Sequence, residues 1–168
     1  MKTIKILKNW HYAINQLPFL PVYVKKHKTV TRIYQFTDSC RYSIDEPSCV
    51  NKLFGWSIGM HHTNSVRVGW SYDNQTEMIQ LWSYYYIGGK LEKKKLCQVN
   101  IDEDVKISIA SSVVYLHGKN TICYDIFIND RVLDMKITDE KIKSFGYTLE
   151  TYFGGESKAP QKILIKLN

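Results

Sequence analysis

The sequence predicts an all-β fold, an antiparallel two-sheet β-sandwich of jelly-roll or lectin-like type with at most one short helix. Apolar and polar residues alternate with a period of two along most of the 168 residues, and a helical period is almost absent. Turn signals rich in Gly, Asn and Asp recur roughly every 8–12 residues, as in sandwich domains. The aromatic content is 13%, led by twelve tyrosines, and aromatic rings pack well on a pleated, half-buried surface.

The first part of the chain is expected to form strands separated by one long loop. Pro18 and Pro21 indicate an edge or connecting segment, because proline cannot donate a hydrogen bond to a ladder. The expected elements, in order, are a strand at 3–8, the edge segment at 17–24, a strand at 30–36, a loop at 38–51, and strands at 53–60 and 65–72. The last of these places Val66, Val68 and Trp70 on one face.

The second part is expected to form hairpins. Gly88-Gly89 and Asn129-Asp130 are typical of tight turns between antiparallel strands. The charged stretch 138–144 is consistent with the one short helix. The expected strands are 77–87, 90–99, 105–110, 113–117, 122–128, 131–137, 147–153 and 162–167.

We expect a single domain over residues 1–168, since this length suits one hydrophobic core and no linker or internal repeat is visible. Residues 1–28 are expected to be extended and able to dock on a partner. The lysine-rich N-terminus cannot form the apolar centre of a signal peptide, and no run approaches the roughly 20 apolar residues of a membrane helix.

The formal net charge of +7 comes mostly from lysine, since the chain has only four arginines. Phosphate neutralisation by nucleic acid is one interpretation. However, the lysines are dispersed and no nucleic-acid motif accompanies them. We therefore expect solvated loops and protected edge strands, and no nucleic-acid partner.

The segment 51–70, NKLFGWSIGMHHTNSVRVGW, contains two strand-like runs on either side of a short polar stretch, residues 61–65, which we call the polar knot. Its candidate binding residues are His61, His62, Asn64, Ser65, Arg67 and Trp70. The simplest interpretation is structural: the knot satisfies buried backbone groups in an irregular turn, and the last two residues pack on a sheet face. The alternative is a glycan-contacting surface, with hydrogen bonds from His62, Asn64 and Arg67 and a nearby ring stacked on a sugar.

A metal site is not expected, and no cofactor is predicted. Adjacent histidines in an extended segment point to opposite faces, and no third ligand is marked beside His61 and His62. The cysteines at positions 40, 49, 97 and 123 lack zinc-type spacing. They are expected to be free thiols in a reducing compartment, although Cys40 and Cys49 are near enough in sequence for a bridge across a loop.

Four marks together resemble a known pattern: NKL-x-G at 51–55, G-x-HH-x-NS-x-R-x-GW at 59–70, a tyrosine-rich strand ending in glycines at 84–89, and YFGG at 152–155 followed by Ala159-Pro160. This pattern is similar to a family of small jelly-roll-like proteins of Bacteroidetes and their bacteriophages, including the crAss-like group. One departure is Gln161, where relatives often carry histidine. The departure weakens any proposal for a third histidine joining His61 and His62.

The resemblance implies a non-catalytic virion component, such as a capsid decoration, head-fibre or tail-associated protein, assembled in the host cytoplasm. Its partners would be other virion proteins or further copies of itself. No nucleophile elbow and no facing pair of carboxylates supports catalysis, so no catalytic residue is predicted. The alternative is a carbohydrate-binding or polysaccharide-lyase-like sandwich acting on host glycans, although the Gln-x-His strand of jelly-roll alginate lyases is absent.

Overall fold

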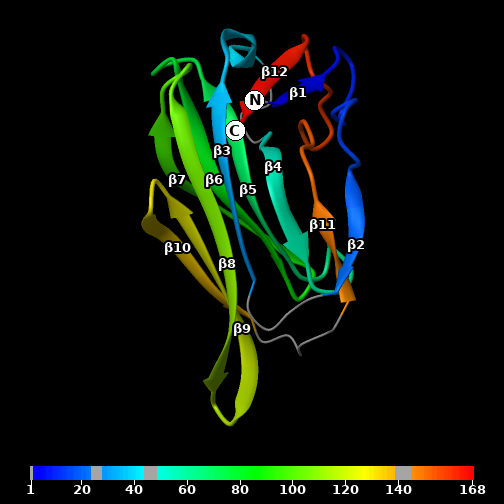
Figure 1. Ribbon diagram of the computed structural model, residues 1–168, viewed down its shortest axis with the longest axis vertical. Coiled ribbons are helices and arrows are strands. Elements are labelled where there is room, and N and C mark those ends of the chain that lie inside the picture. The colour runs from blue at the N-terminus through cyan, green and yellow to red at the C-terminus, as the bar shows by residue number, and fades with distance from the viewer. Residues whose placement is uncertain (1, 24–27, 44–48, 139–144) are drawn as a thin grey trace.

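The computed structural model describes residues 2–23, 28–43, 49–138 and 145–168. Within these ranges, two antiparallel sheets of six strands pack face to face, which confirms the predicted all-β sandwich (Figure 1). Sheet A has the order β1-β12-β3-β8-β9-β10, and sheet B has the order β2-β11-β4-β5-β6-β7. The strands are β1 (Lys2–Ile6), β2 (Phe19–Tyr23), β3 (Lys28–Phe36), β4 (Asn51–Ser57), β5 (Ser65–Asp73), β6 (Met78–Ile87), β7 (Lys90–Val99), β8 (Asp104–Leu116), β9 (Lys119–Ile128), β10 (Arg131–Thr138), β11 (Phe145–Leu149) and β12 (Ile163–Leu167).

Helical structure in the described ranges is limited to one 3₁₀ turn, η1 (Asp38–Cys40), inside the predicted 38–51 loop. The predicted helix at 138–144 is tested only at its first residue. Thr138 ends β10, and residues 139–144 lie outside the described ranges. Among the described residues, no helix has the length and apolar character to cross a membrane.

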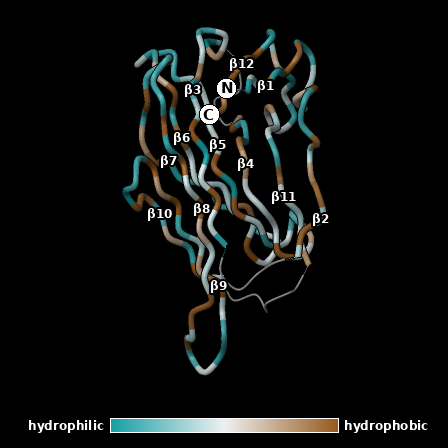
Figure 2. The backbone as a smooth tube through the Cα atoms, viewed as in Figure 1, coloured by the Kyte–Doolittle hydropathy of each residue, from teal (hydrophilic) through white to brown (hydrophobic). Residues whose placement is uncertain are grey.

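The core fills the space between the inner faces of the two sheets. Apolar and polar positions alternate along many strands, as the colours of Figure 2 show. Trp70 is fully buried and its ring lies 5.3 Å from Phe36, 5.7 Å from Tyr42 and 6.1 Å from Phe153, measured between ring centroids. Each large side chain buried in this way contributes about 1.5–3 kcal/mol, so the core dominates stability.

Several predicted strand boundaries were wrong; the strand expected at 53–60, for example, is β4, which begins at Asn51 and ends at Ser57. The strands expected at 105–110 and 113–117 form one continuous strand, β8. The small residues Ser111 and Ser112 do not interrupt it, because both remain paired with β9 in an unbroken register. The strand expected at 147–153 is β11, which begins at Phe145 and ends at Leu149.

The N-terminal segment contributes an edge strand to each sheet. β1 pairs with β12 in sheet A, and β2 pairs with β11 in sheet B. Asn15 fastens the connection between them, since its Nδ2 donates to the Thr3 carbonyl at 2.6 Å and its Oδ1 accepts from the Lys5 amide. The connection passes from one sheet to the other beside the segment after β11, since the Phe153 amide donates to the His11 carbonyl and the Ala159 amide donates to the Trp10 carbonyl. All four cysteines are free, so the Cys40–Cys49 bridge does not form.

Candidate functional site: a groove on the outer face of sheet B

The outer face of sheet B carries cationic and aromatic side chains. The alternation that buries Val66 and Val68 against sheet A turns Arg67 to the opposite face. In the antiparallel register, Arg67 stands opposite Gly55 of β4 and Tyr84 of β6. Neighbouring positions across the sheet thus bring one cation and one ring together.

A groove of about 470 Å³ lies over this face. Its lining includes His61 and His62 from the turn before β5, together with Tyr86 from β6. Tyr12 and Tyr152 line it from the N-terminal connection and from the segment after β11. The groove therefore combines residues that are far apart in sequence.

The polar knot predicted at 61–65 is a tight turn held by its own groups. The Ser65 hydroxyl donates to the His61 carbonyl at 2.7 Å, and the Ile58 amide donates to the Asn64 carbonyl at 3.0 Å. The His62 ring is exposed and rests 5.0 Å from the Tyr86 ring. Burial, followed by the nearby charges of His62 and Arg67, lowers the pKa of His61. The turn thus presents a neutral His61 beside the groove at neutral pH.

Arg67 lies across Gly55 in the groove, where a side chain on the glycine would not fit. A Cβ at Gly55 would be 1.9 Å from the Val66 carbonyl oxygen and 2.9 Å from the Arg67 Cγ. Arg67 Nη2 donates to the Glu150 carbonyl at 2.5 Å. The Glu150 carboxylate is engaged elsewhere, in two 2.6 Å contacts with Arg32.

The charge of Arg67 is only partly compensated. Its Nε atom is shielded from solvent and has no hydrogen-bond partner among the described residues. Burial lowers the pKa of Arg67 to about 10. The guanidinium thus remains charged at neutral pH and keeps an unused donor.

Lys52 is a second buried cation in the groove. Its side chain is 6% exposed, and Nζ donates to the Gly154 carbonyl at 2.7 Å. Nζ also lies 4.9 Å from the Tyr84 ring centroid and 5.5 Å from that of Tyr152. Burial, followed by repulsion from Arg67, lowers the pKa of Lys52 to about 8.

The two motifs of the sequence, at 51–70 and 152–160, meet in this region. Asn51 Oδ1 accepts from the Gly154 amide at 2.6 Å, and Asn51 Nδ2 donates to the Tyr42 hydroxyl at 2.5 Å. Gly154 has φ of +69°, and a Cβ there would lie 1.9 Å from the Ser157 carbonyl oxygen. Gly154 therefore forms a turn that requires positive φ, and this turn delivers the preceding Tyr152 to the groove.

The structure separates the six predicted site residues into two groups. His61, His62, Ser65 and Arg67 line the groove. Asn64 and Trp70 are buried away from it: the Asn64 Oδ1 accepts from the Tyr124 hydroxyl of β9 at 3.0 Å, and Trp70 belongs to the core. The Asn64 side chain is therefore not accessible for the glycan contact that was predicted for it.

Sequence reasoning missed Lys52, Tyr84, Tyr86 and Tyr152 as lining residues. A bulge between Lys52 and Phe54 shifts the register, so simple alternation along β4 does not assign Lys52 to the outer face. Pairing the β6 sequence with β5 in the antiparallel register would have identified the two β6 tyrosines as outer-face residues. Within the described ranges, no group of three or more His, Cys, Asp or Glu side chains is placed to hold a metal ion.

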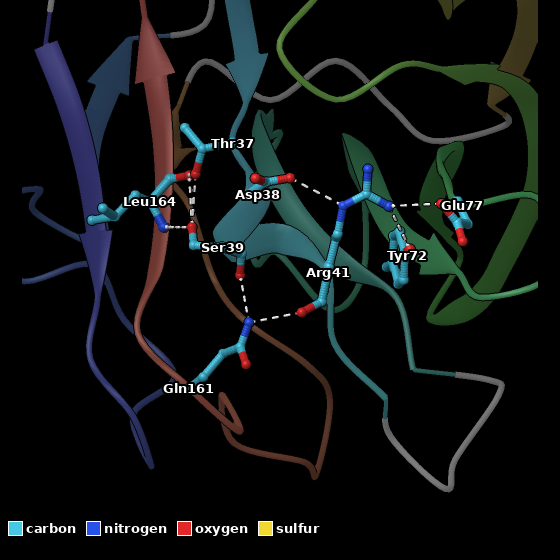
Figure 3. Close-up of polar contacts among 8 residues, drawn as sticks. All are labelled: Thr37, Asp38, Ser39, Arg41, Tyr72, Glu77, Gln161 and Leu164. Carbon is cyan, nitrogen blue, oxygen red and sulfur yellow. Dashed lines mark hydrogen bonds and ion pairs between the residues drawn. The ribbon is translucent and has the colours of Figure 1, made fainter.

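Gln161, which departs from the pattern that the sequence resembles, has a structural role outside the groove. Its Nε2 donates to the Ser39 carbonyl at 2.9 Å and to the Arg41 carbonyl at 2.7 Å, which braces the 3₁₀ turn (Figure 3). Ser39 in turn joins this turn to Leu164 of β12. Position 161 therefore lies beside η1, and Gln161 does not line the groove.

A second hollow, of about 380 Å³, also touches the outer face of sheet B, through Ser71, Trp82 and Lys95. Lys95 lies 5.5 Å from the Trp82 ring centroid, which repeats the cation–ring pairing of the groove.

Comparison with known proteins adds no family assignment, since no protein-family model matches the chain and no curated protein matches it.

Proposed function

We propose that the protein binds carbohydrate, without chemical turnover, in the groove on the outer face of sheet B. The observation that carries this proposal is the combination of accessible rings and hydrogen-bonding side chains along one concave surface. Tyr12 and Tyr86 offer ring faces, and His62 and Arg67 offer donors.

Sugars fit this combination because they have two kinds of surface. Their C–H faces are apolar and pack on aromatic rings, whereas their hydroxyls need hydrogen-bond partners. Tyr12 is 47% exposed and Tyr86 is half-buried, so both rings are open to a ligand. Binding sites in general combine apolar walls with a few convergent polar groups.

The test is a glycan array that contains neutral and acidic oligosaccharides, followed by calorimetry on the strongest ligands. We expect reproducible micromolar binding that is lost in His62→Ala. The matched control is His117→Ala, in the turn between β8 and β9. The absence of any ligand would contradict the proposal, as would equal loss in both variants.

Catalysis is tested on the same ligands. The pure protein should generate neither new reducing ends nor the unsaturated product of a lyase, even after long incubation. Turnover that disappears in Tyr84→Phe or His61→Ala would replace the binding proposal with a polysaccharide-degrading one.

A second candidate function, as a component of a bacteriophage virion, is favoured by the apolar edge at β2 and β11. Phe19, Leu20 and Tyr23 on β2 are 55%, 47% and 73% exposed, and Phe145 on β11 is 50% exposed. Such a cluster at a sheet edge favours protein contact. Mass spectrometry of purified virions tests this candidate, and consistent absence of the chain would remove it. The two functions are compatible, because the edge and the groove use different residues.

A further inference from the structure

We propose that the groove selects acidic glycans, with one carboxylate or sulfate of the glycan seated between Lys52 and Arg67. This inference rests on the proposed carbohydrate-binding function and adds the chemical class of the ligand. It starts from two cations on neighbouring strands, the buried Lys52 on β4 and the half-buried Arg67 on β5, that line one hollow.

The charge balance around this pair is incomplete. Among the described residues, no carboxylate lies within ion-pair distance of Lys52 or Arg67. Two carboxylate residues line the groove, Glu150 and the exposed Glu156. Glu150 binds Arg32 through both carboxylate oxygens and offers Arg67 only its backbone carbonyl, and among the described residues Glu156 forms no ion pair with either cation. Partly desolvated cations without a counter-charge are unfavourable, and a bound anion would relieve this cost.

The donors also suit an oxyanion. Arg67 Nε is shielded from water and has no partner in the described part of the chain, although most buried polar atoms in proteins are paired. A guanidinium favours the planar geometry of a carboxylate, and it also binds sulfate. Lys52 adds a second positive group, fixed by the Gly154 carbonyl and flanked by two tyrosine rings.

Lysines continue beyond the groove along the same face. Lys93 stands opposite Tyr84 in the register of β6 and β7, and Lys95 stands opposite Trp82. A chain with repeated acidic sugars would meet positive charge along this face as well as at the Lys52–Arg67 pair. We favour a glycan over nucleic acid because no nucleic-acid motif accompanies the lysines of the sequence, and because Lys52 and Arg67 line one hollow together with hydroxyl-binding side chains such as His62.

The first experiment compares three polysaccharides by calorimetry at low salt: polygalacturonate, the same polymer after reduction of its carboxyl groups, and dextran sulfate. Polygalacturonate should bind at least tenfold more tightly than its carboxyl-reduced form. Tighter binding of dextran sulfate would assign the anion as a sulfate. Equal binding of the reduced and unreduced polymers would overturn this inference and leave carbohydrate binding standing. No binding of any polysaccharide would instead remove the proposed function itself.

The second experiment uses Arg67→Gln, with Arg131→Gln as the control that removes the same charge from the exposed first residue of β10. Arg67→Gln should lose the preference for the unreduced polymer, and Arg131→Gln should keep it. Arg67→Lys, which retains the charge without the planar fork, serves if the glutamine variant fails to fold, and should reduce the preference in part. Preferential binding of a single-stranded oligonucleotide with the same Arg67 dependence would overturn the glycan assignment.

Discussion

The two faces of β5 carry different chemistry within one short stretch of sequence. The inner face carries Val66, Val68 and Trp70, which are fully buried against sheet A. The outer face carries Ser65 and Arg67, which line the groove. A motif that appears as one unit in the sequence is therefore divided by the period-two geometry of a strand into a core half and a surface half. Variants of the two halves should have separable effects on stability and on binding.

The largest effect is expected for Trp70→Ala. Removal of this fully buried ring should lower the free energy of unfolding by about 3–5 kcal/mol, measured by urea denaturation. The control is Trp82→Ala on β6, whose ring lies on the outer face and is only half-buried. Equal losses in the two variants would mean that the two faces do not differ as described.

Asn51→Ala should have the next largest effect, since it breaks the junction of the two motifs. The substitution leaves the Gly154 amide and the Tyr42 hydroxyl without their buried partner. The expected cost is about 1–3 kcal/mol. Asn74→Ala, in the exposed turn before β6, should stay within about 0.5 kcal/mol of the parent protein. A neutral Asn51→Ala would show that the motifs do not depend on this link.

The pH dependence of binding tests the charged part of the outer face. Lys52 has a pKa lowered to about 8, so it is mostly protonated at pH 7 and mostly neutral at pH 9. Affinity for an acidic glycan should therefore fall as pH rises through 8, by up to about tenfold, since each pKa unit corresponds to 1.36 kcal/mol. Calorimetry at pH 7 and 9 measures the change, and Lys52→Met should remove it. An affinity that rises with pH contradicts this role.

The smallest effect is expected for Tyr86→Ala, which removes one ring from the groove. Affinity should fall roughly three- to tenfold, the value of one aromatic contact, with little change in stability. Tyr115→Ala is the control, because that ring is 72% exposed near the tip of the β8–β9 hairpin. If the control weakens binding as much as Tyr86→Ala does, the ligand contacts a different surface.

The sequence predicted much of the fold because alternation and turn residues are local signals. Trp70 and Arg67 could be assigned to opposite faces by counting, and the turn at Asn129-Asp130 was visible directly. The role of Lys52 could not be predicted, since it depends on a bulge in β4 and on a carbonyl 102 residues further along the chain. The destination of Asn64, a hydrogen bond to Tyr124 in the other sheet, is non-local for the same reason.

The most direct test of the account is amide chemical-shift mapping of the ¹⁵N-labelled protein during titration with an oligogalacturonate. The account predicts that the shifted amides cluster on the outer face of sheet B, at Ser65, Arg67, Tyr84 and Tyr86. Shifts concentrated instead on the outer face of sheet A, for example at Ser108 and Ala110, would contradict it.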